Sequence, residues 1–535
     1  MTLGETIRIG ESPSRRVWFI ALVVLCAVYA LGVSNQWAIS PDGALYLTLG
    51  RSLAEGRGME FNGVQWWGIP PVLPVLIAAC RLVAGDGYWL INLVLSACGV
   101  GTAVVAARTV KRLGAADLAL PVLLTTGFSA YLFITATRIQ TDVLFTFLVA
   151  LGLYGFVRGS AGSPWWIVFG GAAMLLATLT RLPGIVFFAG AVPGLALSLR
   201  RPGRAWRIAA LAAVVIAAAA VLWYWMMYVR SQAAPDTGDY GEATNAYFNT
   251  LLDPRRLNKI LRGLAALPSA AFASLLAQQL NSWLMLGPLL VALLGLATLA
   301  RRGQWIIVLT VVSNVGFLVL FGYSAVARRY LLPTMPFLVY ALLVGTQTAV
   351  AWVRRRQARD GAAAGRMAVG IVATVCIVIS IPKIAREVYW MRSPDFYAAY
   401  EHGEWQNFVL ASRYLREHGR AGIDEVMGPE HTVVHYLSRL GIFTQVLEPG
   451  LGTWKPAAIP PERFVKAAVD SPARFILIPT NAAPWSEEAA SRFAATGLFD
   501  PPVLFGITPA TPSGTLALYT RRGPADGGTG KGQLP

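Results

Sequence analysis

The sequence contains about eleven long apolar windows, each near the 17 to 25 residues that an α-helix needs to cross the hydrocarbon core of a bilayer. Lipid offers the backbone no hydrogen-bond partners, so such segments fold as membrane-spanning helices. The windows cover residues 17–35, 88–107, 117–136, 141–157, 165–180, 184–199, 206–229, 283–300, 304–322, 331–350 and 367–382. We therefore expect a polytopic α-helical membrane protein.

The positive charge of the chain is distributed as in the short loops of a membrane protein. The net charge is +17, yet only 14% of the residues are charged and 55% are hydrophobic. The basic residues form clusters between the windows, such as Arg108, Lys111 and Arg112, and the clusters fit alternate loops. This pattern predicts a cytoplasmic N-terminus and argues against nucleic acid as a partner. The four cysteines lie in apolar stretches without a CxxC pair, which argues against disulfides or structural zinc.

The orientation divides the chain into a membrane domain, residues 1–382, and an extracytoplasmic domain, residues 383–535. Two longer outer segments, 36–87 and 230–282, interrupt the membrane domain, and the apolar "PPVLPVL" part of the first predicts a re-entrant or interfacial helix. Beyond 383, strand-like "RFILIP" and "GTLALYT" alternate with helix-like "EWQNFVLASRYLREHG" and "PPERFVKAAVD". We expect a small α/β domain with a disordered Gly-rich tail.

The stretch "ISPDGALYLTLGRSLAEGRG" predicts a short amphipathic helix in the first outer segment. Ser40 and Pro41 are typical of a helix start, and Gly56 and Gly58 of its end. Helical phase puts Asp42 on the apolar side of this helix, with Leu45, Tyr46, Leu49 and Leu53. The other side is polar and carries Thr48, Arg51 and Glu55. Asp42 is either a first-turn acid that interacts with the helix dipole or a functional carboxylate.

Four arginines lie at the outer ends of predicted spans, against the positive-inside bias: Arg138, Arg181, Arg328 and Arg329. Each is either a snorkelling interfacial side chain or a binder of anions. Asp142 follows Arg138 by four residues, so it is either a helix-start acid paired with that arginine or a second active-site acid. We expect Arg51, on the opposite side of its helix from Asp42, to contact solvent or lipid headgroups.

The order of these motifs resembles the GT-C glycosyltransferases, in the branch of dolichyl-phosphate-mannose protein mannosyltransferases and lipid A aminoarabinose transferases. The resemblance rests on the D-x-x-x-Y-L pattern of the first outer segment and on "TRIQTDVLFTFLVALGLYGF", "LLATLTRLPGIVFF" and "RRYLLPTMPFLVYALL". It covers most of the membrane domain. One departure is Gly43, which stands where many relatives have a second acid.

The resemblance implies a hexosyl- or pentosyltransferase that moves a monosaccharide, with inversion, from a polyprenyl phosphate to a glycan, lipid or protein acceptor. It implies Asp42 as general base, or as a positioning group if the acceptor is a phosphate, with Asp142 as second acid. It also implies that the donor phosphate is bound by Arg138, Arg181, Arg328, Arg329 and Tyr330. The reaction would occur at the outer face of a bacterial inner (plasma) membrane, among membrane lipids.

No cofactor follows from the sequence, and a divalent cation stays open. His431 and His435 are four residues apart, a spacing that can hold zinc, but only Glu430 is near and no HExxH motif is present. Two other functions compete with a transferase. A transporter or flippase of lipid-linked substrates would also need charge in the membrane, although no repeated halves are evident. A membrane scaffold for the outer domain would leave Asp42 and the outward arginines unexplained.

Overall fold

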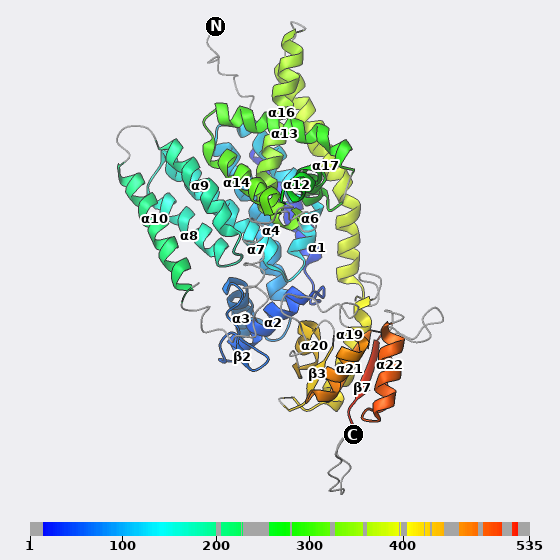
Figure 1. Cartoon of the computed structure of the whole chain (residues 1–535). Helices are drawn as coiled ribbons and strands as arrows, with labels where there is room; N and C mark the ends of the chain where they lie inside the picture. Colours follow the sequence, from blue (N-terminus) through cyan, green and yellow to red (C-terminus); the bar gives the residue numbers. More distant parts are fainter. Residues whose placement is uncertain are drawn as a thin grey trace. The chain divides into compact units, whose positions relative to one another are not determined.

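The structure is a computed structural model of the whole chain (Figure 1). The residues that it describes are 14–199, 205–225, 227, 256–278, 281–321, 327–356, 361–394, 396, 404–421, 423–428, 431–442, 460–479, 485–505 and 516–522. Most of the polar loop 236–256, residue Glu430 and the Gly-rich tail from 523 lie outside this set. The described residues fall into two compact units.

The first unit is helical and comprises the described residues of 14–37, 69–232 and 244–392. Its helices are α1 (Arg15–Gly32), α3 (Val72–Ala84), α4 (Trp89–Arg112), α5 (Ala116–Gly127), α6 (Ala130–Ala136), α7 (Thr141–Ala161), α8 (Trp165–Thr178), α9 (Gly184–Ser198), α10 (Ala205–Tyr224), α12 (Arg256–Leu276), α13 (Ser282–Arg301), α14 (Trp305–Phe321), α15 (Ala327–Leu331), the 3-10 turn η3 (Leu332–Thr334), α16 (Met335–Arg356) and α17 (Gly361–Arg392).

Each of the eleven apolar windows is a helix or a helix pair. Among the described residues, seven helices are long and apolar enough to span a bilayer: α1, α4, α7, α10, α13, α16 and α17. An eighth window forms the pair α5 and α6, which is bent by 56° at Phe128 and Ser129. The remaining three are the shorter apolar helices α8, α9 and α14. The polytopic helical fold is confirmed.

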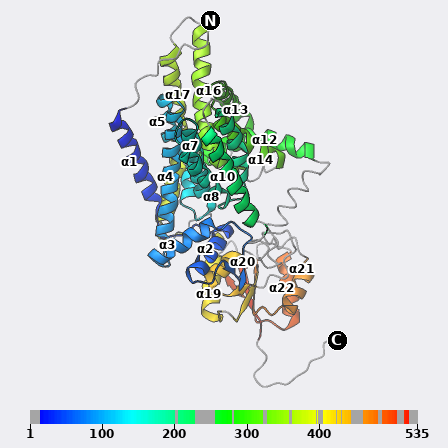
Figure 2. The same ribbon diagram turned by 90° about the vertical axis from the view of Figure 1, so that its left-hand side faces the viewer.

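Helix α12 is an element that the hydropathy pattern does not reveal. It lies in the segment 230–282, and its first turns contain Arg256, Lys259 and Arg262, which lower the mean hydropathy. Its apolar part, Ile260–Leu276, packs against α6, α13, α14 and α15. Figure 2 shows α12 lying across the direction of the long helices of this unit. This part of the expected outer segment therefore belongs to the helical unit.

Helices α13 and α16 approach so closely that only glycine fits where they cross. A methyl group on Gly295 of α13 would overlap the carbonyl oxygen of Ala341, and one on Gly345 of α16 would overlap that of Val291. Small residues allow such backbone contact between helices in a membrane, where dispersion replaces the hydrophobic effect as the cohesive force. This close contact fixes the position of α16 relative to α13. Helix α16 follows α15, the short helix that contains Arg328 and Arg329.

Gly295→Ala should therefore destabilise the helical unit. Forcing a methyl group into the contact costs about 1 to 3 kcal/mol and should lower the midpoint of thermal unfolding in detergent. Gly287→Ala on the same helix is the matched control, because a methyl group there meets nothing within 4 Å. Equal midpoints for the two variants would contradict the close crossing.

The second unit comprises the described residues of 38–68 and 393–522. Its elements are α2 (Pro41–Ala54), β1 (Glu60–Phe61), β2 (Val64–Gln65), α19 (Glu404–His418), β3 (Glu425–Met427), α20 (His431–Ser438), β4 (Gly441–Ile442), α21 (Pro461–Asp470), β5 (Phe475–Pro479), α22 (Trp485–Thr496), β6 (Val503–Phe505) and β7 (Leu516–Thr520). Both expected strands and both expected helices are present. Helix α17 runs to Arg392, so this unit resumes at Ser393.

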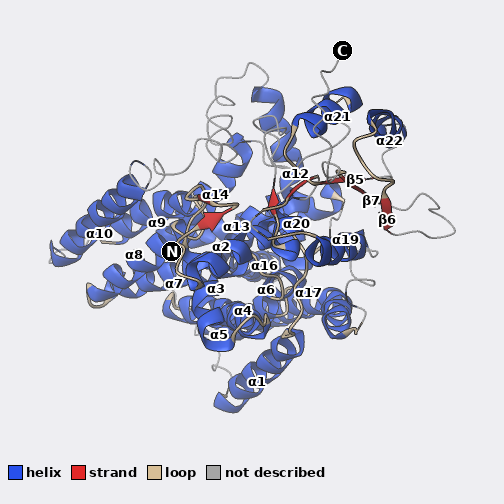
Figure 3. Ribbon diagram, turned by 90° about the horizontal axis from the view of Figure 1, so that it is seen from below, coloured by secondary structure: helices blue, strands red, loops and turns tan. Residues whose placement is uncertain are grey.

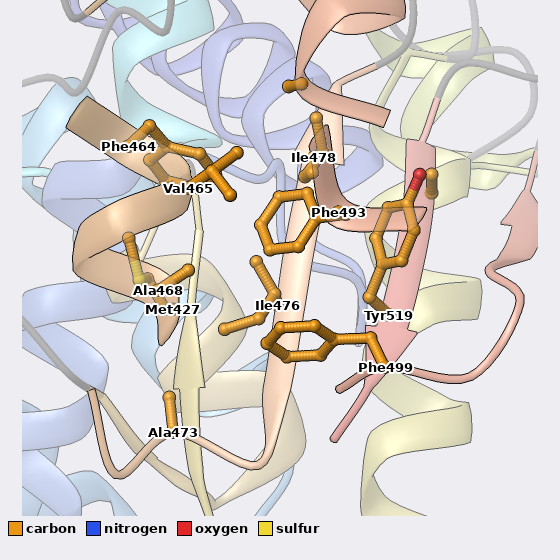
Figure 4. Close-up of a cluster of buried hydrophobic side chains, with 12 residues drawn as sticks. Met427, Phe464, Val465, Ala468, Ala473, Ile476, Ile478, Phe493, Phe499 and Tyr519 are labelled. Carbon is orange, nitrogen blue, oxygen red and sulfur yellow. The ribbon is translucent and has the colours of Figure 1, made fainter. Parts of the chain in front are cut away.

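A five-stranded sheet in the order β4-β3-β5-β7-β6 organises the second unit. Figure 3 shows its strands β5, β7 and β6. β3 pairs in parallel with β4 and β5, whereas β7 pairs antiparallel with β5 and β6. Alternate residues of β5 point to opposite faces: Ile476 joins Phe464 of α21 and Phe493 of α22 in one core, while Leu477 packs with Leu415 of α19 in the other. Figure 4 shows the first of these cores. The α/β character expected from the sequence is confirmed.

Helix α2 begins and ends as predicted. The backbone N–H of Gly43 donates to Ser40 Oγ at 3.1 Å, Pro41 occupies the first helical position, and Gly56 has a φ of 75°. The predicted polar side is exposed only in part: Thr48 is buried and Arg51 partly buried, whereas Glu55 is exposed. The physical reason is that α2 packs against α20, from the far end of the chain, which helical phase alone cannot reveal.

Candidate functional site

Asp142 is a buried carboxylate in the first turn of α7, with a side chain that is 0% exposed. A carboxylate in such a place needs charged or hydrogen-bonding partners, because burial without them is costly. Two arginines from distant segments supply them. Arg329 Nη2 donates to Asp142 Oδ2 at 3.0 Å and Arg329 Nε to Oδ1 at 3.3 Å, and Arg181 Nη1 also donates to Oδ1. The carboxylate is therefore shared between two guanidinium groups.

The geometry of this pairing is specific. Arg329 uses two nitrogens on the two carboxylate oxygens, the fork arrangement that adds directional restraint to the charge interaction. Arg181 lies in the turn between α8 and α9, where its N–H donates to the Ala177 carbonyl at 2.9 Å. Its guanidinium also lies over the Tyr330 ring, 4.9 Å from the centroid. Arg181 is thus held by protein contacts on more than one side, and Arg329 is held by two bonds to one carboxylate.

Short elements hold Arg329 and Tyr330 in place. Both residues belong to α15, which leads through η3 into α16. The Tyr330 carbonyl accepts a hydrogen bond from Asn314 Nδ2 of α14 at 2.9 Å. Because Asn314 is 1% exposed, this bond is shielded from solvent and anchors α15 to α14.

A second buried carboxylate, Glu387 of α17, lies beside Arg138. The distance from Arg138 Nε to Glu387 Oε1 is 3.9 Å, and Thr137 Oγ1 donates to the same oxygen at 3.1 Å. From sequence, the only carboxylate expected beside Arg138 is Asp142, four residues later. Glu387 was missed because it lies at the end of the last apolar helix, 249 residues further on.

Arg328 differs from the other arginines because it is exposed and, among the residues that the structure describes, has no carboxylate partner. Its guanidinium lies over the ring of Tyr131, 5.6 Å from the centroid. Arg138, Arg329 and Asp142 lie near enough to the Tyr131 hydroxyl to exert an electrostatic effect on it. The sequence does not mark Tyr131 as a site residue, because it is one of several aromatic residues within the apolar windows.

The described part of this cluster carries an excess of positive charge. Four arginines are balanced by two carboxylates, Asp142 and Glu387. Guanidinium groups fixed by hydrogen bonds, with a surplus of charge at the ends of apolar helices, suit a phosphate that carries an apolar chain. The structure therefore brings together five of the predicted phosphate-binding residues and Asp142.

The described part of the cluster does not by itself form a metal site. Both oxygens of Asp142 already accept hydrogen bonds from guanidinium groups, and the surplus charge repels a metal. Within the described ranges, no three His, Cys, Asp or Glu side chains form a metal-binding group. The Nδ1 atom of His435 lies 2.7 Å from the Leu440 carbonyl, so this nitrogen is engaged with the backbone.

Asp42 belongs to the other unit. It is partly buried in the first turn of α2, after the Ser40 cap. Arg51, one of its helix neighbours, does not point to solvent as expected: its guanidinium lies 4.4 Å from the centroid of the Tyr436 ring. The expectation was wrong because Tyr436 comes from α20, 385 residues further along the chain. The polar loop 236–256 lies almost entirely outside the described residues.

Asp142→Asn should destabilise the helical unit strongly. The change leaves Arg181 and Arg329 close together without their counter-charge, and breaking a buried ion pair in this way costs about 3 to 5 kcal/mol. A fall in the thermal unfolding midpoint of the purified protein measures the effect. Asp117→Asn is the control, because Asp117 is only partly buried and its partner is the neutral Gln347 amide at 2.9 Å. A midpoint shift no larger than that of the control would argue against the shared ion pair.

No protein-family model matches the sequence, and no curated protein matches it significantly. Solved structures do match. ArnT from Cupriavidus metallidurans bound to undecaprenyl phosphate has 13% identity and a TM-score of 0.56, over 95% of this chain and 98% of that one. Its apo state has 15% identity and a TM-score of 0.56, over 94% of this chain and 98% of that one. Both comparisons span nearly the full length of each protein.

The fold is also similar to that of the Archaeoglobus fulgidus oligosaccharyltransferase tethered with an acceptor peptide. That match has 11% identity and a TM-score of 0.53, over 95% of this chain and 74% of that one. Another structure of the same oligosaccharyltransferase is a complex with Zn and sulfate. At these identities the similarity concerns the fold, and the chain shares the GT-C glycosyltransferase fold, as the sequence motifs indicate.

Proposed function

We propose that this protein is an inverting glycosyltransferase that moves a monosaccharide from a polyprenyl phosphate to an envelope glycan, lipid or protein at the outer face of the membrane. The observation that carries the proposal is the arginine cluster around Asp142. It combines fixed guanidinium groups, one exposed arginine and apolar helices in a fold shared with an enzyme that was solved with undecaprenyl phosphate bound. A lipid phosphate has the two chemical features that this combination suits, an anion and a long apolar chain.

The arginines would act on the leaving group. As the bond between the anomeric carbon and the phosphate oxygen breaks, negative charge develops on the lipid phosphate, and donors held in place beforehand stabilise that charge without reorganising. Arg181 and Arg329 are restrained by Asp142, so their orientation is set before the donor arrives. Arg328, exposed over Tyr131, would make a direct contact with the phosphate. Asp142 would then be a positioning residue and not a general base.

Asp42 would act on the acceptor. The acceptor hydroxyl oxygen attacks the anomeric carbon from the side opposite the phosphate, and Asp42 takes the proton that this hydroxyl loses. A single displacement of this kind inverts the configuration of the anomeric carbon. If the acceptor is instead a phosphate, which is already ionised, Asp42 would orient it and accept no proton.

Asp42→Asn should lower the rate of sugar transfer by about 10²- to 10⁴-fold, the usual contribution of general base catalysis, while thermal stability stays unchanged. The measurement is transfer of radiolabelled sugar from a polyprenyl-phosphate donor in reconstituted membranes. Glu55→Gln is the matched control, because it removes an exposed carboxylate at the other end of the same helix. Wild-type transfer rates in the Asp42→Asn variant would exclude Asp42 as the base.

Comparison of envelope glycans and lipids with and without the gene separates a transferase from a flippase. A transferase predicts loss of one sugar from its acceptor, together with retention of that sugar on the lipid donor. Movement of the donor across vesicle membranes by the purified protein, without transfer, would instead support the flippase.

Arg328→Gln should raise the KM for the donor more than it lowers kcat. Loss of one charge-assisted hydrogen bond of about 1.5 to 3 kcal/mol should raise the KM for the donor about tenfold or more. Arg158→Gln is the control. The Arg158 guanidinium also lies over an aromatic ring, 3.7 Å from the centroid of Trp166, but Arg158 is in the last turn of α7, whereas Asp142 is in the first. An unchanged KM in Arg328→Gln would remove this residue from the phosphate site.

A further inference from the structure

Residues 38–68 and the C-terminal part of the chain belong to one compact unit, and two neighbouring residues of α20 contribute to the contact between them. Arg51 of α2 lies over the Tyr436 ring at 4.4 Å, and its Nη2 donates to the Tyr436 carbonyl at 3.5 Å. One residue earlier, the His435 ring meets the edge of Phe61 of β1, with 4.9 Å between centroids.

These contacts lie in a largely dry environment. Phe61 and Tyr436 are 4% and 3% exposed, and Thr48, which lies one turn before Arg51 on the same side of α2, is 7% exposed. The attraction between a guanidinium and the face of an aromatic ring is stronger when water is excluded. The contact therefore holds α2 in a defined orientation relative to α20.

Helix α2 carries Asp42 in its first turn, nine residues before Arg51 on the same rigid element. A rotation of α2 about its axis, or fraying at its N-terminus, would move the Asp42 carboxylate. Displacement of a reacting group by about 1 Å can lower a rate by about 10²-fold.

We propose that α20 is a positioning element for the transfer reaction: Tyr436, through Arg51, orients the helix that presents Asp42. The C-terminal domain would then be an integral part of the catalytic apparatus and not an accessory module. The inference rests on the proposed function for its effect on rate, but the contact itself can be measured without any sugar chemistry.

The test uses the full-length protein, three single variants and one double variant. Tyr436→Ala removes the ring, Tyr436→Phe keeps the ring and loses only the hydroxyl, and Tyr414→Ala removes a partly buried ring of α19 that stacks on His418. Tyr414 is the matched control for general destabilisation of the domain. The readouts are hydrogen exchange of the α2 amides and the kinetic constants of sugar transfer.

We expect Tyr436→Ala to raise the exchange rate of the α2 amides and to lower kcat at least about tenfold, with the KM for the donor unchanged within about twofold. Tyr436→Phe should restore both values to those of the wild type, and Tyr414→Ala should change neither. The double variant Arg51→Gln with Tyr436→Ala should be no worse than Tyr436→Ala alone, because the two side chains act as one unit.

Wild-type exchange of α2 in Tyr436→Ala would overturn the inference even if sugar transfer is confirmed. Equal effects of Tyr436→Ala and Tyr414→Ala would also overturn it, since they would reflect loss of domain stability. Conversely, if Tyr436→Ala increases α2 exchange but the wild-type protein transfers no sugar, the proposed function is refuted while the contact between α2 and α20 is supported.

Discussion

The arrangement of cations in the helical unit depends on one carboxylate, Asp142, shared by two guanidinium groups. Each charge would be unfavourable in its place without the other two: the acid is buried and the arginines would repel each other. Together they connect the start of α7, the turn between α8 and α9, and the short helix α15. The interaction therefore contributes to the packing of the unit and fixes the donors of a charged site.

This dual role explains why the cluster is built at the ends of apolar helices. An arginine surrounded by hydrocarbon needs a fixed counter-ion, and one surrounded by water loses its electrostatic strength through screening. At the end of a span, Asp142 restrains two cations while Arg328 stays exposed. A ligand with a phosphate and a long apolar chain is matched by both parts of such a site.

Much of this architecture could be predicted from sequence, because helix length and the period of apolar residues are local properties. The eleven windows, the cap of α2 and the strand β5 are of this kind. The pairing of residues that are far apart in the sequence is not a local property. The local spacing favoured Arg138 as the partner of Asp142, whereas the structure pairs Asp142 with Arg181 and Arg329, 39 and 187 residues away. Local periodicity cannot specify which distant segments meet.

The same limitation bears on Asp42. Read alone, its helix has an apolar and a polar side, and the polar side predicts contact with water or headgroups. In the structure Thr48 on that side is buried and Arg51 lies over Tyr436 of α20, so a helix that hydropathy describes as interfacial packs against α20 within the second unit. A carboxylate on a helix covered on both sides has less freedom than one on a surface helix. The restraint that general base catalysis requires could thus come from residues that are nearly 400 positions away in the sequence.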